Sequence, residues 1–351
     1  MKHNILFIAT FCLLLFTACE KVIEFNGEQT KPLLVVNGIQ RQGKPACVSV
    51  SRSQFFLSSD NNYSVNNVNV NLYINGQFIE TLQHKIDTID GCWNNETLDI
   101  YCGTHELEAG DSVRFEVSAP NFTTAKAGTI IPNIPFIISF DTTRAEITTF
   151  GDVYDDYPYN DFDQYGNPCC IRELFGDTIW PNDIRVGSFY FNLKFSDPAN
   201  QVNYYNLSMI DGFTNPFSSD FVFTTDNIDA LSQVSSAFED ESDCYLRTVN
   251  PFRDIYFSGK EYDLSFYEST NYNFYNESSV KFTIGLSNVD YNYYQYVRTY
   301  NQADENDGFG SLIGMFREPT QVYSNVDGGL GIVCSESAVS KRSIVIYRRR
   351  N

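Results

Sequence analysis

The residues best suited to metal chemistry are four carboxylates in one acidic segment, residues 151–168. They are Asp155, Asp156, Asp161 and Asp163. Carboxylate oxygens are the hard ligands that Ca²⁺ prefers, so the segment is a candidate calcium loop. The run that begins at Asp161 breaks the EF-hand pattern at its fifth position, and Arg172 stands where the closing glutamate would be. The sequence therefore favours a solvated acidic loop and keeps calcium as the alternative, with no other cofactor expected.

The same segment carries tyrosines interleaved with the acids. They are Tyr154, Tyr157, Tyr159 and Tyr165. Tyrosine combines an apolar ring with a polar tip, so such a loop could contact a sugar, a peptide or a partner protein. Many of the other tyrosines are expected to be ordinary sheet residues.

Motifs of nucleophilic or metal-dependent catalysis are missing from the sequence. It contains no GxSxG, no HExxH and no phosphate-binding glycine loop. Two histidines remain after the N-terminal segment, His84 and His105, and they are 21 residues apart. We expect no enzyme. A surface hydrolase that uses two facing carboxylates is the less favoured alternative, because the separation of such a pair is set in three dimensions.

Cysteine usage suggests disulfides in an exported chain. The best pair is Cys92 and Cys102, since the residues between them could turn a hairpin. Cys170, or its neighbour Cys169, is a candidate partner for Cys244. Cys47 and Cys334 are interpreted as small buried apolar residues.

The N-terminus has the pattern of a lipoprotein signal peptide. Met1-Lys2-His3 is followed by an apolar run over residues 5–16 and then by Thr17-Ala18-Cys19. Twelve apolar residues are too few to span a bilayer, for which about 20 are needed. We expect residues 1–18 to be removed, Cys19 to carry the lipid, and residues 19–32 to form a tether.

Charge and composition narrow the class further. The net charge of −20 opposes binding to nucleic acid, so no nucleic-acid partner is expected. The chain has 29 Phe and 23 Tyr, and such aromatic residues favour strands.

Alternating patterns predict a mainly β fold in two parts. About seven short strands over residues 33–131, with Asn75-Gly76 as a hairpin signal, predict an immunoglobulin-like β-sandwich. Two prolines at 132 and 135 mark a boundary. Residues 132–351 are then expected to form a larger β domain, a curled sheet or barrel-like, with a helix near 288–302.

Three segments carry a resemblance to a known family. They are Leu34–Gly38, Tyr293–Tyr300 and Phe316–Ile332. Together they resemble a Bacteroidota lipoprotein family catalogued as domain of unknown function 4249. The third segment includes Gly328-Gly329-Leu330-Gly331, which we interpret as a tight turn or bulge packed against a sheet.

The resemblance implies a lipid-anchored outer-membrane protein, expected at the cell surface. Such proteins are often encoded beside TonB-dependent transporters and are thought to assist capture or uptake. No catalytic residues are established for the family, and none are carried over. A structural or adhesive surface protein is the alternative, and it predicts an exposed edge strand or multimers.

Overall fold

The computed structural model describes most of the chain between residues 31 and 347. The described residues are 31–55, 58, 62–90, 95–149, 172–174, 177–179, 185–211, 219–222, 246–248, 251–272, 279–307 and 321–347. Among them no helix is both long enough and apolar enough to cross a membrane.

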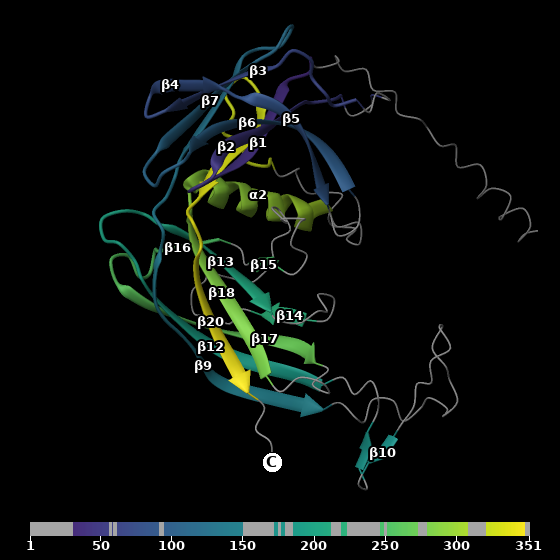
Figure 1. Cartoon of the computed structure of the whole chain (residues 1–351), viewed down its shortest axis with the longest axis vertical. Coiled ribbons are helices and arrows are strands. Elements are labelled where there is room, and N and C mark those ends of the chain that lie inside the picture. Colours follow the sequence, from purple (N-terminus) through teal and green to yellow (C-terminus); the bar gives the residue numbers. More distant parts are fainter. Residues whose placement is uncertain are drawn as a thin grey trace, which may run out of the picture.

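Two sheets pack face to face in the upper part of Figure 1 and form the N-terminal sandwich. One layer comprises β1 (Leu34–Arg41), β2 (Pro45–Arg52), β5 (Gln83–Asp90), β6 (Asn95–Glu106) and β19 (Leu330–Glu336). The other comprises β3 (Asn69–Ile74), β4 (Gln77–Thr81), β7 (Ser112–Ser118) and β8 (Ala125–Ile130).

Strict alternation of apolar and polar residues produces this sandwich. In β3, Val70, Leu72 and Ile74 are at most 6% exposed, while the residues between them face outward or to the rim. Asn75 and Gly76 then adopt positive φ angles of 53° and 81°, as a two-residue hairpin turn requires. The predicted hairpin is confirmed.

The C-terminal strand β19 completes the sandwich by pairing in parallel with β1. Gly331 (φ 107°) lies opposite Val36 in this pairing. A Cβ atom built on Gly329 would come within 2.7 Å of the Leu34 carbonyl oxygen, so a glycine is needed where the backbones approach. The glycine-rich run is a turn packed against a sheet, as predicted.

A second pair of sheets forms the lower part of the molecule. One continues the sheet of β1 and contains β13 (Tyr204–Asp211), β15 (Leu246–Thr248), β16 (Phe252–Arg253), β18 (Ser279–Val289) and β20 (Ser340–Tyr347). The facing sheet contains β9 (Phe136–Thr149), β12 (Arg185–Ser196), β14 (Ser219–Val222) and β17 (Glu261–Tyr272). A separate hairpin pairs β10 (Arg172–Leu174) with β11 (Asp177–Ile179).

Aromatic rings fill the core of this lower sandwich. The Phe191 ring lies 5.4 Å from Phe140, 5.5 Å from Phe266 and 5.0 Å from Phe282 between ring centroids. Phe191 and Phe282 come from opposite sheets, and both are almost completely buried. Edge-to-face and offset ring pairs of this kind stabilise a core beyond the apolar area that they bury.

One ten-stranded sheet therefore runs through both sandwiches. Its upper and lower parts meet where Val289 of β18 pairs with Glu336 of β19. The yellow C-terminal strands in Figure 1 run from the upper sandwich to the lower one. The predicted boundary after residue 131 separates consecutive strands along the chain, but β19 returns from the C-terminal part to the first sandwich.

The described helix, α2 (Tyr291–Asp307), lies beneath the N-terminal sandwich in Figure 1. Tyr293 and Val297 on its buried face pack against Ile332 and Cys334 of β19. The helix was predicted near 288–302. The fold class is confirmed as mainly β, with an immunoglobulin-like sandwich first, a larger β part after it, and a helix. The barrel-like alternative for the second part is not observed, because the described strands form open sheets and no closed barrel.

The disulfide prediction for Cys102 is wrong. Cys102 bonds to Cys47, because the two residues lie opposite each other in the β2–β6 pairing with a Cα–Cα distance of 4.2 Å. The hairpin of β5 and β6 places Gln83 opposite Cys102 on its other side. Cys47 is thus part of a disulfide rather than a small apolar residue with a free thiol, whereas Cys334 is buried and forms no disulfide.

Replacing Cys47 and Cys102 together by serine should lower the free energy of unfolding by about 2–4 kcal/mol, because the bond closes a long loop in the unfolded chain. Urea unfolding of the oxidised proteins measures the change. A Cys92→Ser variant is the matched control and should keep the crosslinked Cys47–Cys102 peptide in a non-reducing digest. A Cys92–Cys102 peptide in the wild-type digest would contradict this assignment.

Candidate functional site

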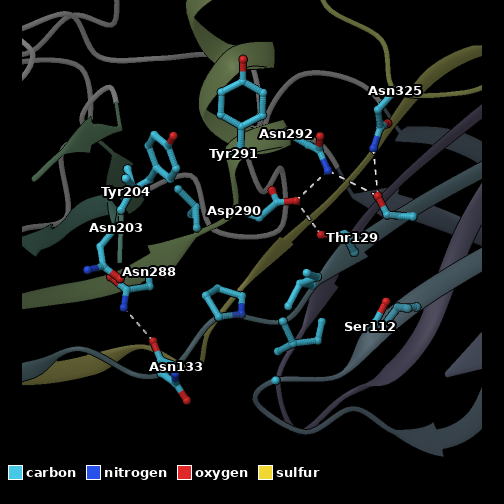
Figure 2. A pocket seen from close by; sticks show the side chains of 18 of the residues that line it. Ser112, Thr129, Asn133, Asn203, Tyr204, Asn288, Asp290, Tyr291, Asn292 and Asn325 are labelled. Atoms are coloured by element: carbon cyan, nitrogen blue, oxygen red, sulfur yellow. Dashed lines mark hydrogen bonds between the residues drawn. The ribbon is translucent and has the colours of Figure 1, made fainter. Parts of the chain in front are cut away.

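A groove of about 780 Å³ lies between the N-terminal sandwich and the lower strands. β7 and β8 form one wall, and the end of β18, the start of α2 and the loop before β13 form the other. Figure 2 shows the side chains that line it. The polar ones that the argument uses are Asn133, Asn203, Tyr204, Asn288, Asp290, Tyr291, Asn292 and Asn325.

Asp290 is the residue that fixes the inner wall. Its Oδ1 accepts hydrogen bonds from the backbone N–H of Tyr293 (2.9 Å) and of Ser335 (3.2 Å). Its Oδ2 accepts from Thr129 Oγ1 (2.5 Å) and Asn292 Nδ2 (2.8 Å). The bond from Tyr293 is that of a helix N-cap, a position where aspartate is strongly preferred. One carboxylate thus begins α2 and joins it to β8 and β19.

Burial governs the protonation of Asp290. Loss of water contact raises the pKa of its carboxyl above the usual value, and the four donors oppose this only in part. Four donors also fill the lone-pair positions of a carboxylate. Asp290 therefore serves as a structural acceptor and offers no free oxygen to act as a general base.

Side-chain amides cover the outer edge of β8. Asn325 Nδ2 donates to the carbonyl oxygens of Gly128 (3.1 Å) and Val333 (2.7 Å), and its Oδ1 accepts from the Val333 N–H (2.9 Å). Asn292 Nδ2 donates to the same Gly128 oxygen at 3.3 Å. These amides replace a neighbouring strand, because an edge strand otherwise leaves its carbonyl groups unpaired.

Asn288 is the polar residue whose hydrogen bonding is incomplete. It is 3% exposed, and its Nδ2 donates to the Asn133 carbonyl oxygen at 2.8 Å (Figure 2). Its Oδ1 has no hydrogen-bond partner, a condition shared among the described side chains by Asn206 Oδ1. An unsatisfied buried acceptor costs about 1–3 kcal/mol, so a group that donates to it would be stabilising.

A buried network holds the loop at the lower rim of the groove. Asp197 Oδ1 accepts from Tyr205 OH (2.5 Å) and Asn203 Nδ2 (3.0 Å), and Asp254 Oδ2 accepts from the Asn203 N–H (3.0 Å). Desolvation and then the nearby charge of Asp197 raise the pKa of the Asp254 carboxyl. Asn203 thus links two buried acids and positions its neighbour Val202 at the groove mouth.

The charged residues of the other wall are engaged elsewhere. The Arg114 guanidinium lies 4.1 Å from the centre of the Tyr73 ring. Lys126 Nζ pairs with Glu116 Oε1 at 2.9 Å. The lining contains no histidine or cysteine, and among the described residues no group of three metal-ligating side chains is placed to hold an ion. The charged side chains of the groove are therefore all in contact with other groups of the protein.

Most residues that the sequence singled out lie outside the described part of the chain. They are Cys19, Cys92, Cys170, Cys244, Asp155, Asp156, Asp161, Asp163, Tyr154, Tyr157, Tyr159 and Tyr165. Apart from the pairing of Cys92 with Cys102, which the Cys47–Cys102 bond rules out, the predictions made for them stay predictions. Within the described residues, His84 on β5 pairs with Asp99 at 2.8 Å, and His105 lies on β6 with its backbone N–H bonded to Glu80.

The sequence interpretation missed Asp290, Asn288 and Asn325. Asp290 had a detectable signal, because aspartate directly before a periodic apolar run is a helix start. Asn288 and Asn325 had none, since an asparagine in a strand or loop gives no sign of what it contacts.

Family comparison assigns the chain. A family model described as "Domain of unknown function (DUF4249)" matches residues 20–342. The chain belongs to the DUF4249 family. That match spans every lining residue of the groove and the described strands of both sandwiches, apart from the end of β20 beyond residue 342. No curated protein matches the chain.

Solved structures show only distant likeness to this DUF4249 chain. A Corynebacterium diphtheriae protein described as membrane anchored is 8% identical with a TM-score of 0.18, covering 75% of this chain; the match spans 55% of that protein. The Enterococcus faecalis protein ACE is 8% identical with a TM-score of 0.19, and the match covers 73% of this chain and 87% of that protein. The BspA C-terminal domain of Streptococcus agalactiae is 7% identical with a TM-score of 0.20, and the match covers 73% of this chain and 95% of that domain. TM-scores this low establish no shared function.

Replacing Asp290 by asparagine should change how stability depends on pH. The raised pKa means that folded Asp290 holds its proton more tightly than the unfolded chain does. Its contribution to stability is therefore greatest below the unfolded pKa of about 3.9 and falls as the pH rises through the folded value. The free energy of unfolding, wild type minus Asp290→Asn, should fall in urea titrations as the pH rises from the unfolded pKa through the higher folded one. A constant or rising difference would show that burial does not control this carboxyl.

Proposed function

We propose that this protein is a non-enzymatic, lipid-anchored protein of the outer membrane that captures a ligand in the groove between its two sandwiches. The observation that carries the proposal is the groove itself. Its volume of about 780 Å³ falls in the usual range of ligand sites, about 300–1,000 Å³. It has a rigid wall of engaged polar groups and one buried acceptor, Asn288 Oδ1, that lacks a donor.

The N-terminal sequence supports the lipid anchor of this proposal. Lipid on Cys19, with residues 19–32 as a tether, would hold the N-terminal sandwich near the membrane, since β1 begins at Leu34. Captured ligand could then pass to a TonB-dependent transporter, the partner that the family resemblance implies. Calcium at residues 151–168 is not needed for this function.

Two measurements test the anchor and the partner. A Cys19→Ala chain exported by an ordinary secretory signal peptide in place of residues 1–18 should leave the membrane fraction while keeping the wild-type melting temperature, because only the lipid is lost. The tagged wild-type lipoprotein, isolated from its own outer membrane in mild detergent, should carry a TonB-dependent transporter in stoichiometric amount by mass spectrometry. Recovery as a free monomer, with the protein intact and surface-exposed, would count against transport.

A structural or adhesive surface role is the second candidate, and one observation favours it. Strand β5 ends the ten-stranded sheet within the described residues, and Ile86 on it is 68% exposed. An edge strand with an exposed apolar residue is a template for pairing with another chain.

This second role predicts self-association through β5. Light scattering of the Cys19→Ala chain at increasing concentration should then reveal multimers, and an added Ile86→Lys substitution should abolish them because a charged edge opposes pairing. Val339→Lys, at a residue 39% exposed and outside β5, is the control. If the Cys19→Ala chain is monomeric at every concentration, the structural role is contradicted.

A further inference from the structure

We infer that the groove binds an uncharged carbohydrate, an assignment that rests on the proposed ligand-capturing function and names its ligand class. The argument uses the charge, the hydrogen-bonding groups and the apolar surface of the lining.

Charge does not select the ligand. The charged residues that line the groove are Arg114, Lys126 and Asp290, and each is engaged within the protein. Arg114 lies over the Tyr73 ring, Lys126 pairs with Glu116, and Asp290 accepts four hydrogen bonds. Lys126 and Arg114 both lie near the Glu116 carboxylate, and Asp290 has no free oxygen, so the lining offers little net charge to a phosphate, a carboxylate or a cation.

Neutral amides and hydroxyls dominate the remaining polar lining. Of these, Thr129, Asn203, Asn292 and Asn325 are hydrogen-bonded within the protein. The set also contains Ser112, Asn133, Gln201, Tyr204, Asn288 and Tyr291. An amide both donates and accepts hydrogen bonds, and a sugar hydroxyl does the same. Asn288 Oδ1 is the buried acceptor of this set that lacks a donor, which a hydroxyl can supply.

Apolar surface lies at the mouth of the groove. Tyr291 is 50% exposed, Ile130 60% and Val202 66%, and these side chains come from α2, β8 and the loop before β13. The Tyr291 ring is braced by Tyr204 at 6.0 Å and by Tyr323 at 6.2 Å between centroids. A braced aromatic ring beside aliphatic side chains suits the C–H face of a pyranose.

An extended peptide fits the groove less well. Such a peptide binds by adding a strand to a free sheet edge. The edge of β8 is occupied, because the Gly128 oxygen accepts from Asn292 and Asn325, and the Ile130 oxygen accepts from Ser335 Oγ at 2.7 Å. At Lys126 the edge pairs with the backbone of Asp327.

Binding is coupled to the segment that connects the sandwiches. Asn288 Oδ1 has less than 1 Å² exposed, so a ligand hydroxyl can reach it only if the Asn288 side chain moves. The same amide donates to the Asn133 carbonyl oxygen, so this movement also changes the hydrogen bond between β18 and the connecting segment, residues 132–135.

Calorimetric titration of the full-length lipoprotein tests the inference. The detergent must lack a sugar headgroup, because alkyl glycosides would compete. The probes are neutral oligosaccharides (maltohexaose, cellohexaose, xylohexaose, mannohexaose and chitohexaose), the anionic polymer polygalacturonate, and a tryptic digest of casein. At least one neutral oligosaccharide should bind, and polygalacturonate should not.

Substitutions at exposed groove residues locate the binding. Val202→Glu and Tyr291→Ala should each weaken it about tenfold, equivalent to the loss of one good apolar or aromatic contact. Ile86→Glu, at a residue equally exposed but on β5, is the matched control and should bind as wild type does. Equal melting temperatures exclude unfolding as the cause.

The outcomes separate the inference from the proposed function. Failure of every neutral oligosaccharide to bind, or binding unaffected by both groove substitutions, overturns the carbohydrate assignment. Casein peptides or polygalacturonate that bind and are lost with Val202→Glu would overturn it while leaving the groove as a capture site. If no probe binds, both the assignment and the capture function fail.

Discussion

The structure depends on one buried carboxylate. Asp290 caps α2 and accepts hydrogen bonds from Thr129 of β8 and the backbone of Ser335 in β19, so three elements meet at two oxygen atoms. The ten-stranded sheet is narrow there, since β18 meets β19 at the single pair of Val289 and Glu336. Side-chain hydrogen bonds therefore hold the sandwiches together where backbone pairing is thinnest.

This arrangement explains why the charged side chains of the groove are engaged within the protein. Each ionised group on its walls is needed to join strands or to stabilise a neighbour, as Lys126 does with Glu116. Amides cover the β8 edge that would otherwise attract another strand. What remains for a ligand is a set of neutral groups, a braced tyrosine and one unsatisfied acceptor.

Local patterns in the sequence predicted local structure well. The alternation of Val70, Leu72 and Ile74 and the Asn75-Gly76 turn are properties of neighbouring residues. Strand pairings between distant parts of the chain were not predictable, because a single sequence does not show which residues of β1 and β19, or of β2 and β6, lie opposite each other. The Cys47–Cys102 bond and the groove depend on such pairings, so both were missed.

The parallel pairing of β1 with β19 has a consequence for biogenesis. Val35 of β1 pairs with Leu330 of β19, so β1 cannot complete its pairing until the C-terminal part of the chain is present. Closing so long a loop is slow, so the N-terminal sandwich stays incomplete until the C-terminal strands have folded. A chain shortened before β19 would leave β1 as an open edge. The pairing of β19 is therefore the event that completes the first sandwich.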